Sequence, residues 1–428
     1  MSSTAQAAVA AFKAPKGTHD VLPPESARWE ALVAVFATRV GRAGYGLVIT
    51  PVFEDIGVWE RVGESTDLVR KEMYDFRDKG GRHVALRPEG TASVVRAFIQ
   101  HRPVAPFKAW YVAPNFRYEA PQAGRYRQHH QLGVEAIGSD DPDLDVEIID
   151  LAWGLYGALG LRRVRLLLNS MGDGTCRPPY RKLLLEYLER RAGELCHEHR
   201  GTYAANPLRV LDCKREPCRQ VTAEAPWQLD HLCDECQAHF DRVQEGLDAV
   251  GIPATIELRL VRGLDYYTRT TFEFAAEALE SAQNAVGGGG RYDGLAEALG
   301  GPATPGIGFG MGIERILLAC DAEGAFPAPE ERLDAFVVDA TGGSAARDIS
   351  HELRDAGLRV DRVFDQRSLK AGMRLAGRSG ARFALVVGGD ELEKGVVGVK
   401  PLREKGDQVE VPRQALAAHL RRALAGES

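Results

Sequence analysis

The sequence predicts an α/β protein of two or three domains, and three features of the chain support this. The first is a β-hairpin predicted between Lys108 and Gly138. The second is a helix-favouring stretch over residues 172–256, and the third is a βαβα pattern in the last hundred residues. A chain of 428 residues is long enough for each domain to bury its own core.

Composition and charge narrow the classes of function. Apolar residues make up 44% of the chain, which is ordinary for a globular protein, and the absence of a long apolar run excludes a membrane span. The net charge of −6 excludes a generally basic nucleic-acid-binding protein, so any RNA contact must come from local patches. Seven cysteines in a chain of this length do not form a disulfide framework, which predicts a cytoplasmic location. Residues 1–15 predict a mobile tail rather than a secretory signal.

The first predicted elements are a helix and a short strand. The helix begins at Pro23-Pro24-Glu25, because proline is tolerated in a first turn and an acid there meets the positive end of the helix dipole. Apolar residues then recur at helical spacing and form one stripe, which indicates core packing: Trp29, Leu32, Val33, Phe36 and Val40. A strand is predicted over residues 47–50 and is stopped by Pro51.

The hairpin pairs strands predicted at Trp110–Glu119 and Gln128–Ile137. Because side chains alternate along a strand, Gln131, Gly133 and Glu135 share one face, and three apolar residues, Leu132, Val134 and Ala136, share the other. The polar face predicts a floor for a small polar ligand. The arginines around the loop, Arg117, Arg125 and Arg127, predict a phosphate site, since a guanidinium binds phosphate oxygens bidentately. A half-exposed hairpin with solvated charges is the alternative.

Two glycine-rich segments suit a flat ligand. Gly287 to Gly290 allow close approach to the backbone, although a flexible loop would explain them too, and no strand–helix unit supports a dinucleotide fingerprint. Alternating glycines from Gly306 to Gly312 leave one strand face bare, and Arg315 follows in the first turn of a helix. This predicts a slot for a planar base with a cation at its phosphate end, with tight strand–helix packing as the alternative.

The segment Arg262–Arg269 holds two tyrosines, an acid and two arginines. This density exceeds that of an ordinary loop, but the spacing alone assigns no role. Beyond a linker at 326–330, strands are predicted at Ala335–Val338, Leu358–Val363, Phe383–Val387 and Val396–Val399. Two helix-length segments separate the first three strands, which predicts a small α/β domain with a mainly parallel sheet.

Two cysteine pairs, Cys213-x4-Cys218 and Cys233-x2-Cys236, raise the question of a metal. Their spacing suits a tetrahedral structural zinc with four thiolates and no open position. Four ordinary cysteines are the alternative interpretation, and His231 and His239 are alternative ligands. The remaining cysteines, Cys176, Cys196 and Cys320, are predicted to be unpaired.

Taken in this order, the segments resemble the histidyl-tRNA synthetases, a family of class II aminoacyl-tRNA synthetases, from about Lys16 onward. Residues 16–20 (Lys-Gly-Thr-His-Asp) resemble the family's N-terminal signature. The three class II motifs are matched by Tyr45–Pro51, by Phe116–Glu135 and by Gly308–Arg315. Arg262–Tyr267 and Gly288–Asp293 resemble the two segments peculiar to the histidine enzymes.

The resemblance implies a fold and a domain order. It implies a class II catalytic domain over 16–171 and 257–325, with a six-stranded antiparallel sheet flanked by helices, and an inserted helical domain over 172–256. It further implies an anticodon-binding α/β domain with a mixed sheet over 331–428 and a homodimer formed through the catalytic domain.

The implied reaction has two steps, in which ATP with Mg²⁺ converts L-histidine to histidyl-adenylate and the histidyl group then passes to tRNA-His. By resemblance, Arg117 and Arg262 hold opposite sides of the α-phosphate, where other class II enzymes use a metal, and Arg315 holds the γ-phosphate. The other implied ATP-binding residues are Glu119, Arg125 and Tyr126. The implied histidine-binding residues are Glu89, Thr91 and Gln131 at the ammonium group, Glu135 and Tyr267 at the imidazole, and Arg262, Tyr266 and Tyr292 around the pocket. Gln122 is implied to meet the acceptor end of the tRNA.

The chain departs from the family pattern at Ala120 and His129, which flank the loop that meets the tRNA. Two other functions compete with the implied one. A non-catalytic regulatory paralogue of histidine biosynthesis lacks the anticodon domain and parts of the Arg262 segment, both of which this chain keeps. A different acyl-adenylating ligase on the same fold would explain Arg117 and Arg315 but not that segment.

Overall fold

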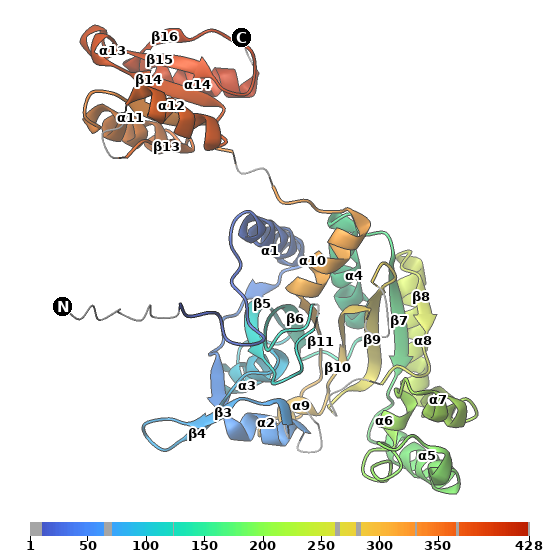
Figure 1. The fold of residues 1–428 in the computed structure, drawn as a ribbon. Helices are drawn as coiled ribbons and strands as arrows, with labels where there is room; N and C mark the ends of the chain where they lie inside the picture. Colours follow the sequence, from blue (N-terminus) through green and yellow to red (C-terminus); the bar gives the residue numbers. More distant parts are fainter. Residues whose placement is uncertain are drawn as a thin grey trace, which may run out of the picture. The chain divides into compact units, whose positions relative to one another are not determined.

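The computed structural model describes residues 11–63, 71–122, 124–261, 266–279, 284–329, 332–364 and 368–426. The chain divides into two compact units at the boundary between Ala328 and Pro329 (Figure 1). Of the predicted mobile tail, residues 1–10 lie outside the described residues. No helix in the described part of the chain has the length and apolar composition needed to cross a bilayer.

The first unit is built on a sheet in which the described strands follow the order β1-β5-β6-β11-β10-β9-β7-β8 (Figure 1). The strands are β1 (Gly46–Leu47), β5 (Phe107–Phe116), β6 (Gln128–Ile137), β7 (Val164–Ser170), β8 (Ala254–Ile256), β9 (Thr268–Ala276), β10 (Ala285–Arg291) and β11 (Gly306–Gly312). The six strands from β5 to β7 pair antiparallel throughout. The predicted six-stranded antiparallel sheet is therefore present, and two short edge strands, β1 and β8, extend it by parallel pairing.

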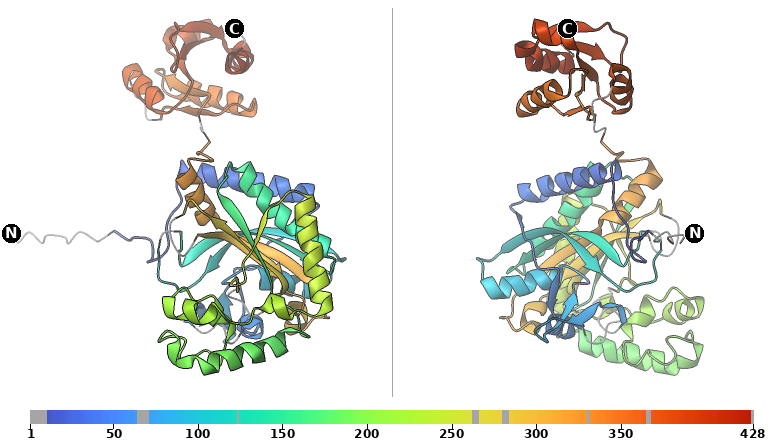
Figure 2. Two further views of the ribbon diagram at one scale, coloured as in Figure 1. Left: turned by 90° about the vertical axis from the view of Figure 1, so that its right-hand side faces the viewer. Right: turned by 60° about the vertical axis from the view of Figure 1, so that its left-hand side comes forward.

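Four helices cover one face of this sheet (Figures 1 and 2). They are α1 (Glu25–Arg42), α4 (Pro142–Ala158), α8 (Asp234–Ala249) and α10 (Ile313–Glu323). The predicted stripe of α1 lies in this core through its buried members Leu32, Phe36 and Val40. Burial of such large apolar side chains stabilises the unit by about 1.5–3 kcal/mol each. Packing of the helices against this face therefore stabilises the sheet.

The opposite face carries a smaller set of elements. They are α2 (Ile56–Gly63), α3 (Thr91–His101), α9 (Leu295–Ala298) and a three-stranded sheet of β2 (Phe53–Asp55), β4 (His83–Leu86) and β3 (Asp75–Arg77). The helices pack with Tyr111 of β5 and with Tyr292 in a second core. This cover extends over only part of the face, and the glycine-rich part of β6, β10 and β11 lines a pocket.

Residues 172–256 are mainly helical. The helices α5 (Arg177–Arg190), α6 (Leu208–Leu211) and α7 (Glu216–Thr222) share a separate core, which includes Tyr180, Leu184 and Val210. Helix α8 instead buries Phe240 and Val243 in the core of the large sheet. In Figure 1 α5, α6 and α7 accordingly lie together as a group of their own.

The second unit contains a five-stranded sheet in the order β13-β12-β14-β15-β16. Its elements are β12 (Ala335–Asp339), α11 (Ser344–Asp355), β13 (Val360–Arg362), α12 (Leu369–Arg378), β14 (Phe383–Val387), α13 (Gly389–Lys394), β15 (Val396–Pro401), β16 (Val409–Pro412) and α14 (Leu416–Ala425). The sheet is mixed, because β12 pairs parallel with β13 and β14 whereas β15 pairs antiparallel with both neighbours. The prediction of a mainly parallel sheet from the strand spacing was therefore wrong. Strand β15 runs antiparallel to β14 because the connection between them is shorter than the dozen or so residues of a parallel crossover.

Candidate active site

A floor of glycines lies on the partly open face of the large sheet. In the pairing register Gly308 lies opposite Glu135, and Gly310 lies opposite Gly133 and Gly288. A Cβ atom at Gly308 would collide with the Glu135 carboxylate, and one at Gly310 would collide with the Gln131 amide. The predicted face assignment is confirmed, since the three apolar residues 132, 134 and 136 are buried in the core behind the sheet. The missing side chains make room for Glu135 and Gln131.

Glu135 is the most strongly perturbed acid of the floor. Its side chain is fully buried and accepts hydrogen bonds from Tyr292 Oη at 2.6 Å, from Thr91 Oγ1 at 2.7 Å and from Tyr111 Oη at 3.3 Å. Burial raises the pKa of Glu135 to about 8, and the nearby Glu89 adds to this rise. An acid held in this way can pair with a cationic or hydrogen-bonding ligand that enters the pocket.

Three tyrosines pack together beside this acid, and one of them, Tyr292, contacts it directly. The ring centroids of Tyr266 and Tyr267 lie 4.8 Å apart, and that of Tyr266 lies 6.0 Å from Tyr292 with the two rings edge to face. Tyr267 and Tyr292 are buried. The faces of these rings, with a carboxyl group beside them, suit contact with a small flat ring.

The polar groups predicted for the ammonium end lie beside Glu135. Both carboxylate oxygens of Glu89 accept backbone N–H groups at the start of α3, from Thr91 at 2.6 Å and from Ala92 at 2.9 Å. Burial raises the pKa of Glu89, and these hydrogen bonds oppose the rise. Asn115 Nδ2 donates to Gln131 Oε1 at 2.7 Å, which fixes the orientation of that amide. The helix start and the strand pair therefore hold these side chains in place.

Arginines lie farther along the floor and line a pocket of about 360 Å³. Arg117 Nε donates to the Pro88 carbonyl at 2.9 Å, and Arg315 Nε donates to the Ala285 carbonyl at 2.5 Å. Burial, and then the positive charge of Arg125, lower the pKa of Arg315. Glu119 approaches Arg125 at 3.5 Å and Arg117 at 3.9 Å. Guanidinium groups held so close together form a site for an anion of several charges.

The remaining predicted residues lie at the rim. The rings of Tyr126 and His19 lie 4.3 Å apart, so the N-terminal segment rests on the hairpin loop, and Tyr126 lines the pocket. Gln122 pairs through its backbone with Arg125, at N–O distances of 3.1 and 2.9 Å, and is exposed. Burial, followed by the charge of Arg117, lowers the pKa of His129 to about 3, so this lining residue is neutral at pH 7.

Arg262, the second arginine predicted at the α-phosphate, lies outside the described residues, as do residues 263–265. The chain on either side of this gap is described. Val261 lines the arginine pocket, and Tyr266 packs against Tyr292.

Sequence reasoning missed three residues of the site. Tyr111 donates to Glu135 and faces Gly133, and the pairing of the two hairpin strands could have revealed it. Glu273 of β9 lines the arginine pocket opposite Gly288. Asp212 reaches the same pocket from the end of α6, and no local pattern signals this contact because it depends on how the inserted helices fold back.

The structure corrects the predicted grouping of the cysteines. Cys213 and Cys218 lie with Cys196 and His199, whereas Cys233 and Cys236 lie with Asp173 and Cys176. The predicted set of four thiolates is thus divided, because each pair folds against a different, more N-terminal segment. His231 and His239 belong to neither group, and His239 instead contacts Asp145 at 2.7 Å. Cys176 and Cys196, which were expected to be unpaired, each join a group.

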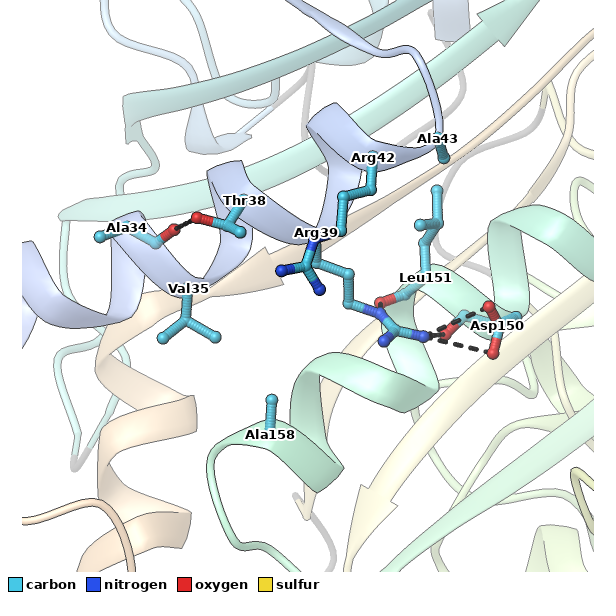
Figure 3. Close-up of a pocket in the computed structure, with 9 residues that line it drawn as sticks. All are labelled: Ala34, Val35, Thr38, Arg39, Arg42, Ala43, Asp150, Leu151 and Ala158. Carbon is cyan, nitrogen blue, oxygen red and sulfur yellow. Dashed lines mark hydrogen bonds and ion pairs between the residues drawn. The ribbon is translucent and has the colours of Figure 1, made fainter.

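A second cavity of about 560 Å³ lies between α1 and α4, behind the sheet (Figure 3). Its one described cation–anion pair joins Arg39 to Asp150, at 3.2 Å, and the same guanidinium donates to the Leu151 carbonyl at 3.0 Å. No predicted site residue lines this cavity. Arg39 and Thr38 bind groups of the cavity's own lining, and the glycine-floored pocket, where the predicted residues gather, remains the candidate active site.

Comparison with known proteins agrees with this geometry. Residues 17–316 match the family model of histidyl-tRNA synthetase, and residues 335–423 match that of an anticodon-binding domain. The histidine–tRNA ligase of Rhodococcus erythropolis is 53% identical over 408 residues, which cover 94% of this chain and 95% of the relative. That of Geobacillus kaustophilus is 46% identical and covers 97% of this chain and 100% of its own length. The crystal structure of apo histidyl-tRNA synthetase from S. aureus superposes with a TM-score of 0.81 at 36% identity, over 96% of this chain and 100% of that structure. The chain belongs to the histidyl-tRNA synthetase family.

Proposed function

We propose that this protein ligates L-histidine to tRNA-His in two steps. ATP and histidine form histidyl-adenylate with release of pyrophosphate, and the histidyl group then passes to a terminal ribose hydroxyl of the tRNA with release of AMP. One observation carries the proposal: a buried acid among tyrosines and a cluster of arginines lie on the same glycine floor. An amino acid and a nucleotide bound there would meet end to end.

The histidine side chain enters the tyrosine-walled end of the pocket. Its imidazole contacts Glu135 and Tyr267, with Tyr266 and Tyr292 closing the walls, and its ammonium group lies near Glu89, Thr91 and Gln131. The burial of Glu135 and the fixed amide of Gln131 support this orientation. A site whose buried polar groups require both ring nitrogens rejects analogues without them by about 10⁴-fold or more.

ATP occupies the arginine-lined end. Arg117 holds the α-phosphate, Arg125 and Arg315 hold the outer phosphates, and Tyr126 and Glu119 border the adenine. The carboxylate of Glu273 lines the same pocket and offers the oxygen ligands that Mg²⁺ prefers. When bound with the nucleotide, Mg²⁺ neutralises charge on the β- and γ-phosphates. The protein's own part is to orient the phosphorus for in-line attack by the histidine carboxylate.

Arg262 acts on the opposite side of the α-phosphate from Arg117. The position of its described neighbours supports this assignment, since Val261 lines the ATP end and Tyr266 the histidine end. Charge builds on the phosphoryl oxygens in the transition state, so a preorganised guanidinium on each side lowers the barrier.

The remaining assignments concern tRNA and assembly. The exposed Gln122 meets the acceptor end of tRNA-His, and the unit after residue 329 binds the anticodon. The two units correspond to a catalytic part with inserted helices over 172–256 and an anticodon-binding part over 331–428, joined by the linker 326–330.

A homodimer forms through the catalytic unit, where apolar side chains are exposed around the first class II motif: Leu47 (52%), Ile49 (86%) and Phe53 (53%). The protein acts in the cytoplasm.

Amino-acid-dependent exchange of pyrophosphate into ATP tests the proposal against its alternatives. Exchange with histidine and with no other amino acid is the expected result. A regulatory paralogue would give no exchange, and a different acyl-adenylating ligase would give exchange with another acid. The match of residues 335–423 to an anticodon-binding domain favours the synthetase over both.

A further inference from the structure

We propose that the chain holds two separate structural zinc ions, one within its inserted helices and one where the inserted segment joins the unit of the large sheet. One site, here called the module site, consists of Cys196, His199, Cys213 and Cys218. The other, here called the base site, consists of Asp173, Cys176, Cys233 and Cys236. Each offers three thiolates and a fourth ligand of a different kind, an imidazole in the first and a carboxylate in the second.

The module site has the dimensions of a tetrahedral centre. Its four ligand atoms all lie within 4.8 Å of one another. His199 Nδ1 lies 3.3 Å from Cys196 Sγ and 3.7 Å from Cys218 Sγ. Zinc bonds of about 2.3 Å to sulfur and about 2.0–2.1 Å to nitrogen, at tetrahedral angles, place these atoms about 3.5 Å apart. The ligands are therefore spaced for an ion between them.

The base site has similar dimensions. Its four ligand atoms also lie within 4.8 Å of one another. Asp173 Oδ1 lies 3.6 Å from Cys176 Sγ and 3.8 Å from Cys233 Sγ. The same bond lengths place an oxygen and a sulfur ligand about 3.5 Å apart. Arg269 approaches Asp173 at 3.7 Å and offsets the negative charge that three thiolates and a carboxylate leave on a zinc ion.

The surroundings orient the ligands of both sites. The backbone N–H of Cys196 donates to Cys218 Sγ at 3.4 Å, and that of Asp173 donates to Cys176 Sγ at 3.4 Å. Asp173 Oδ1 also accepts the Thr175 N–H at 2.9 Å. Hydrogen bonds of this kind hold metal ligands in position and stabilise thiolate charge. Four protein ligands leave no open position, so the role at each site is structural.

The positions of the two sites show which parts of the chain each zinc ion would join and stabilise. The helices α5, α6 and α7 form a core separate from that of the large sheet. Its buried residues all lie between Tyr180 and Ala225, and so small a core contributes little stability by itself. The module site joins the segment before α6 to α7, across that core. The base site joins the segment after β7 to the start of α8, where the chain leaves the large sheet and returns to it. The ion at the module site thus cross-links the inserted helices to one another, and the ion at the base site cross-links the two ends of the inserted segment.

Metal analysis of the full-length protein, purified without an affinity tag and dialysed against metal-free buffer, tests the proposal. We expect two zinc ions per chain. The pair Cys196→Ser and Cys218→Ser removes one of them, and the pair Cys233→Ser and Cys236→Ser removes the other. Cys320→Ser is the matched control, because Cys320 is buried in the core of the large sheet, and this variant retains both ions.

A second measurement covers variants that fail to fold. X-ray absorption at the zinc edge of the wild-type protein should show, on average, three sulfur ligands at about 2.3 Å and one nitrogen or oxygen ligand at about 2.0–2.2 Å per zinc. Protein that has seven free thiols and no zinc above background overturns the proposal. A single zinc per chain bound by four sulfurs also overturns it, since that result would restore the one-site arrangement of Cys213, Cys218, Cys233 and Cys236.

Discussion

At the residue scale, the pocket depends on an acid whose ordinary ionisation is suppressed. Glu135 sits on a floor that only glycine neighbours permit and is surrounded by three hydroxyl groups. Its pKa is raised to about 8 mainly by burial, so unliganded protein keeps its proton at neutral pH. A ligand that supplies a hydrogen-bonding or cationic partner, as an imidazole does, offsets the cost of ionising this group and favours its charged form.

The raised pKa of Glu135 predicts a pH-dependent stability of the unliganded protein. The native state holds a proton that the unfolded state releases near pH 4.5, so the stabilisation is complete below that pH and is lost as the pH rises to about 8. Relative to Glu135→Gln, the wild-type free energy of unfolding should fall across this window and level off above it. Urea titrations of both proteins from pH 5 to 9 measure this, and a difference that does not change with pH would contradict the assignment.

The same substitution tests recognition of histidine. Glu135→Gln keeps the shape of the side chain but cannot supply a charged acceptor to the imidazole. We expect kcat/KM for histidine to fall by at least about 10²-fold, the scale of a lost charged hydrogen bond, while KM for ATP changes little. ATP–pyrophosphate exchange gives both values. An unchanged preference for histidine would exclude Glu135 from the imidazole site.

Arg262 is predicted to act in the transition state. Arg262→Ala should slow adenylate formation by at least about 10²-fold, the usual effect of removing a preorganised donor. Arg165→Ala is the matched control, because this half-exposed arginine pairs with Glu277 at 3.0 Å on the surface and should leave the rate unchanged. Rapid-quench kinetics of the first step measure both variants, and a near-normal rate in Arg262→Ala would remove it from the mechanism.

At the element scale, the alternation of β6 and β11 carries the site, and this alternation could be predicted. A period of two predicted that Gln131 and Glu135 share one face and that the glycines at 308 and 310 leave a strand face bare. The pairing of β11 with β6 was not predicted, and its register brings these faces together. The cysteines show the limit of the same reasoning. Spacing along the chain predicted one metal site from residues 213, 218, 233 and 236, but tertiary packing brings Cys176 and Cys196 against them from distant segments.

The glycine floor makes a prediction of its own. Gly308→Ala places a Cβ atom 2.0 Å from a Glu135 carboxylate oxygen. The carboxylate must then shift by about 1 Å, and misplacement on this scale should lower the exchange rate by at least about 10²-fold. Gly157→Ala in α4 is the control, because a Cβ there meets no atom within 4 Å and should leave activity intact. Thermal unfolding of both variants shows whether the fold is kept. Normal exchange by Gly308→Ala would show that the floor tolerates a side chain.

At the scale of the whole molecule, the proposed function assigns chemistry and tRNA selection to different units. The glycine floor, the tyrosines and the arginines all lie before Ala328, and the unit after it has its own sheet and core. The order of these units and the mixed sheet of the second followed from a resemblance to the family. The local pattern alone predicted a mainly parallel sheet. That prediction failed at β15, which runs antiparallel to β14 because the connection between them is too short for a parallel crossover.

Removal of the second unit should therefore separate the two steps. A chain ending at Ala328 should retain histidine-dependent exchange, since the first unit has a complete core and the whole described pocket. Its kcat/KM for charging tRNA-His should fall by about 10²-fold or more, the scale of losing one of two linked binding contacts. Aminoacylation assays with a tRNA-His transcript measure this. Undiminished charging would contradict the anticodon-binding assignment.

The exposed apolar side chains near the first motif predict the assembly state. Ile49 is 86% exposed in a single chain, and a dimer would bury it. Ile49→Lys should dissociate the dimer, whereas Val250→Lys, at a 55% exposed position at the end of α8, should not. Sedimentation velocity distinguishes the two species. A monomeric wild-type protein would contradict the proposed dimer.

In the proposed reaction, one pocket activates histidine and passes it to tRNA-His. A single-turnover experiment tests this most directly, with enzyme in excess over labelled histidine, ATP and Mg²⁺, followed by addition of tRNA-His. We expect labelled histidyl-adenylate to accumulate on the enzyme and the label then to move to the tRNA. Absence of the adenylate, or an adenylate whose label never reaches tRNA-His, would contradict it.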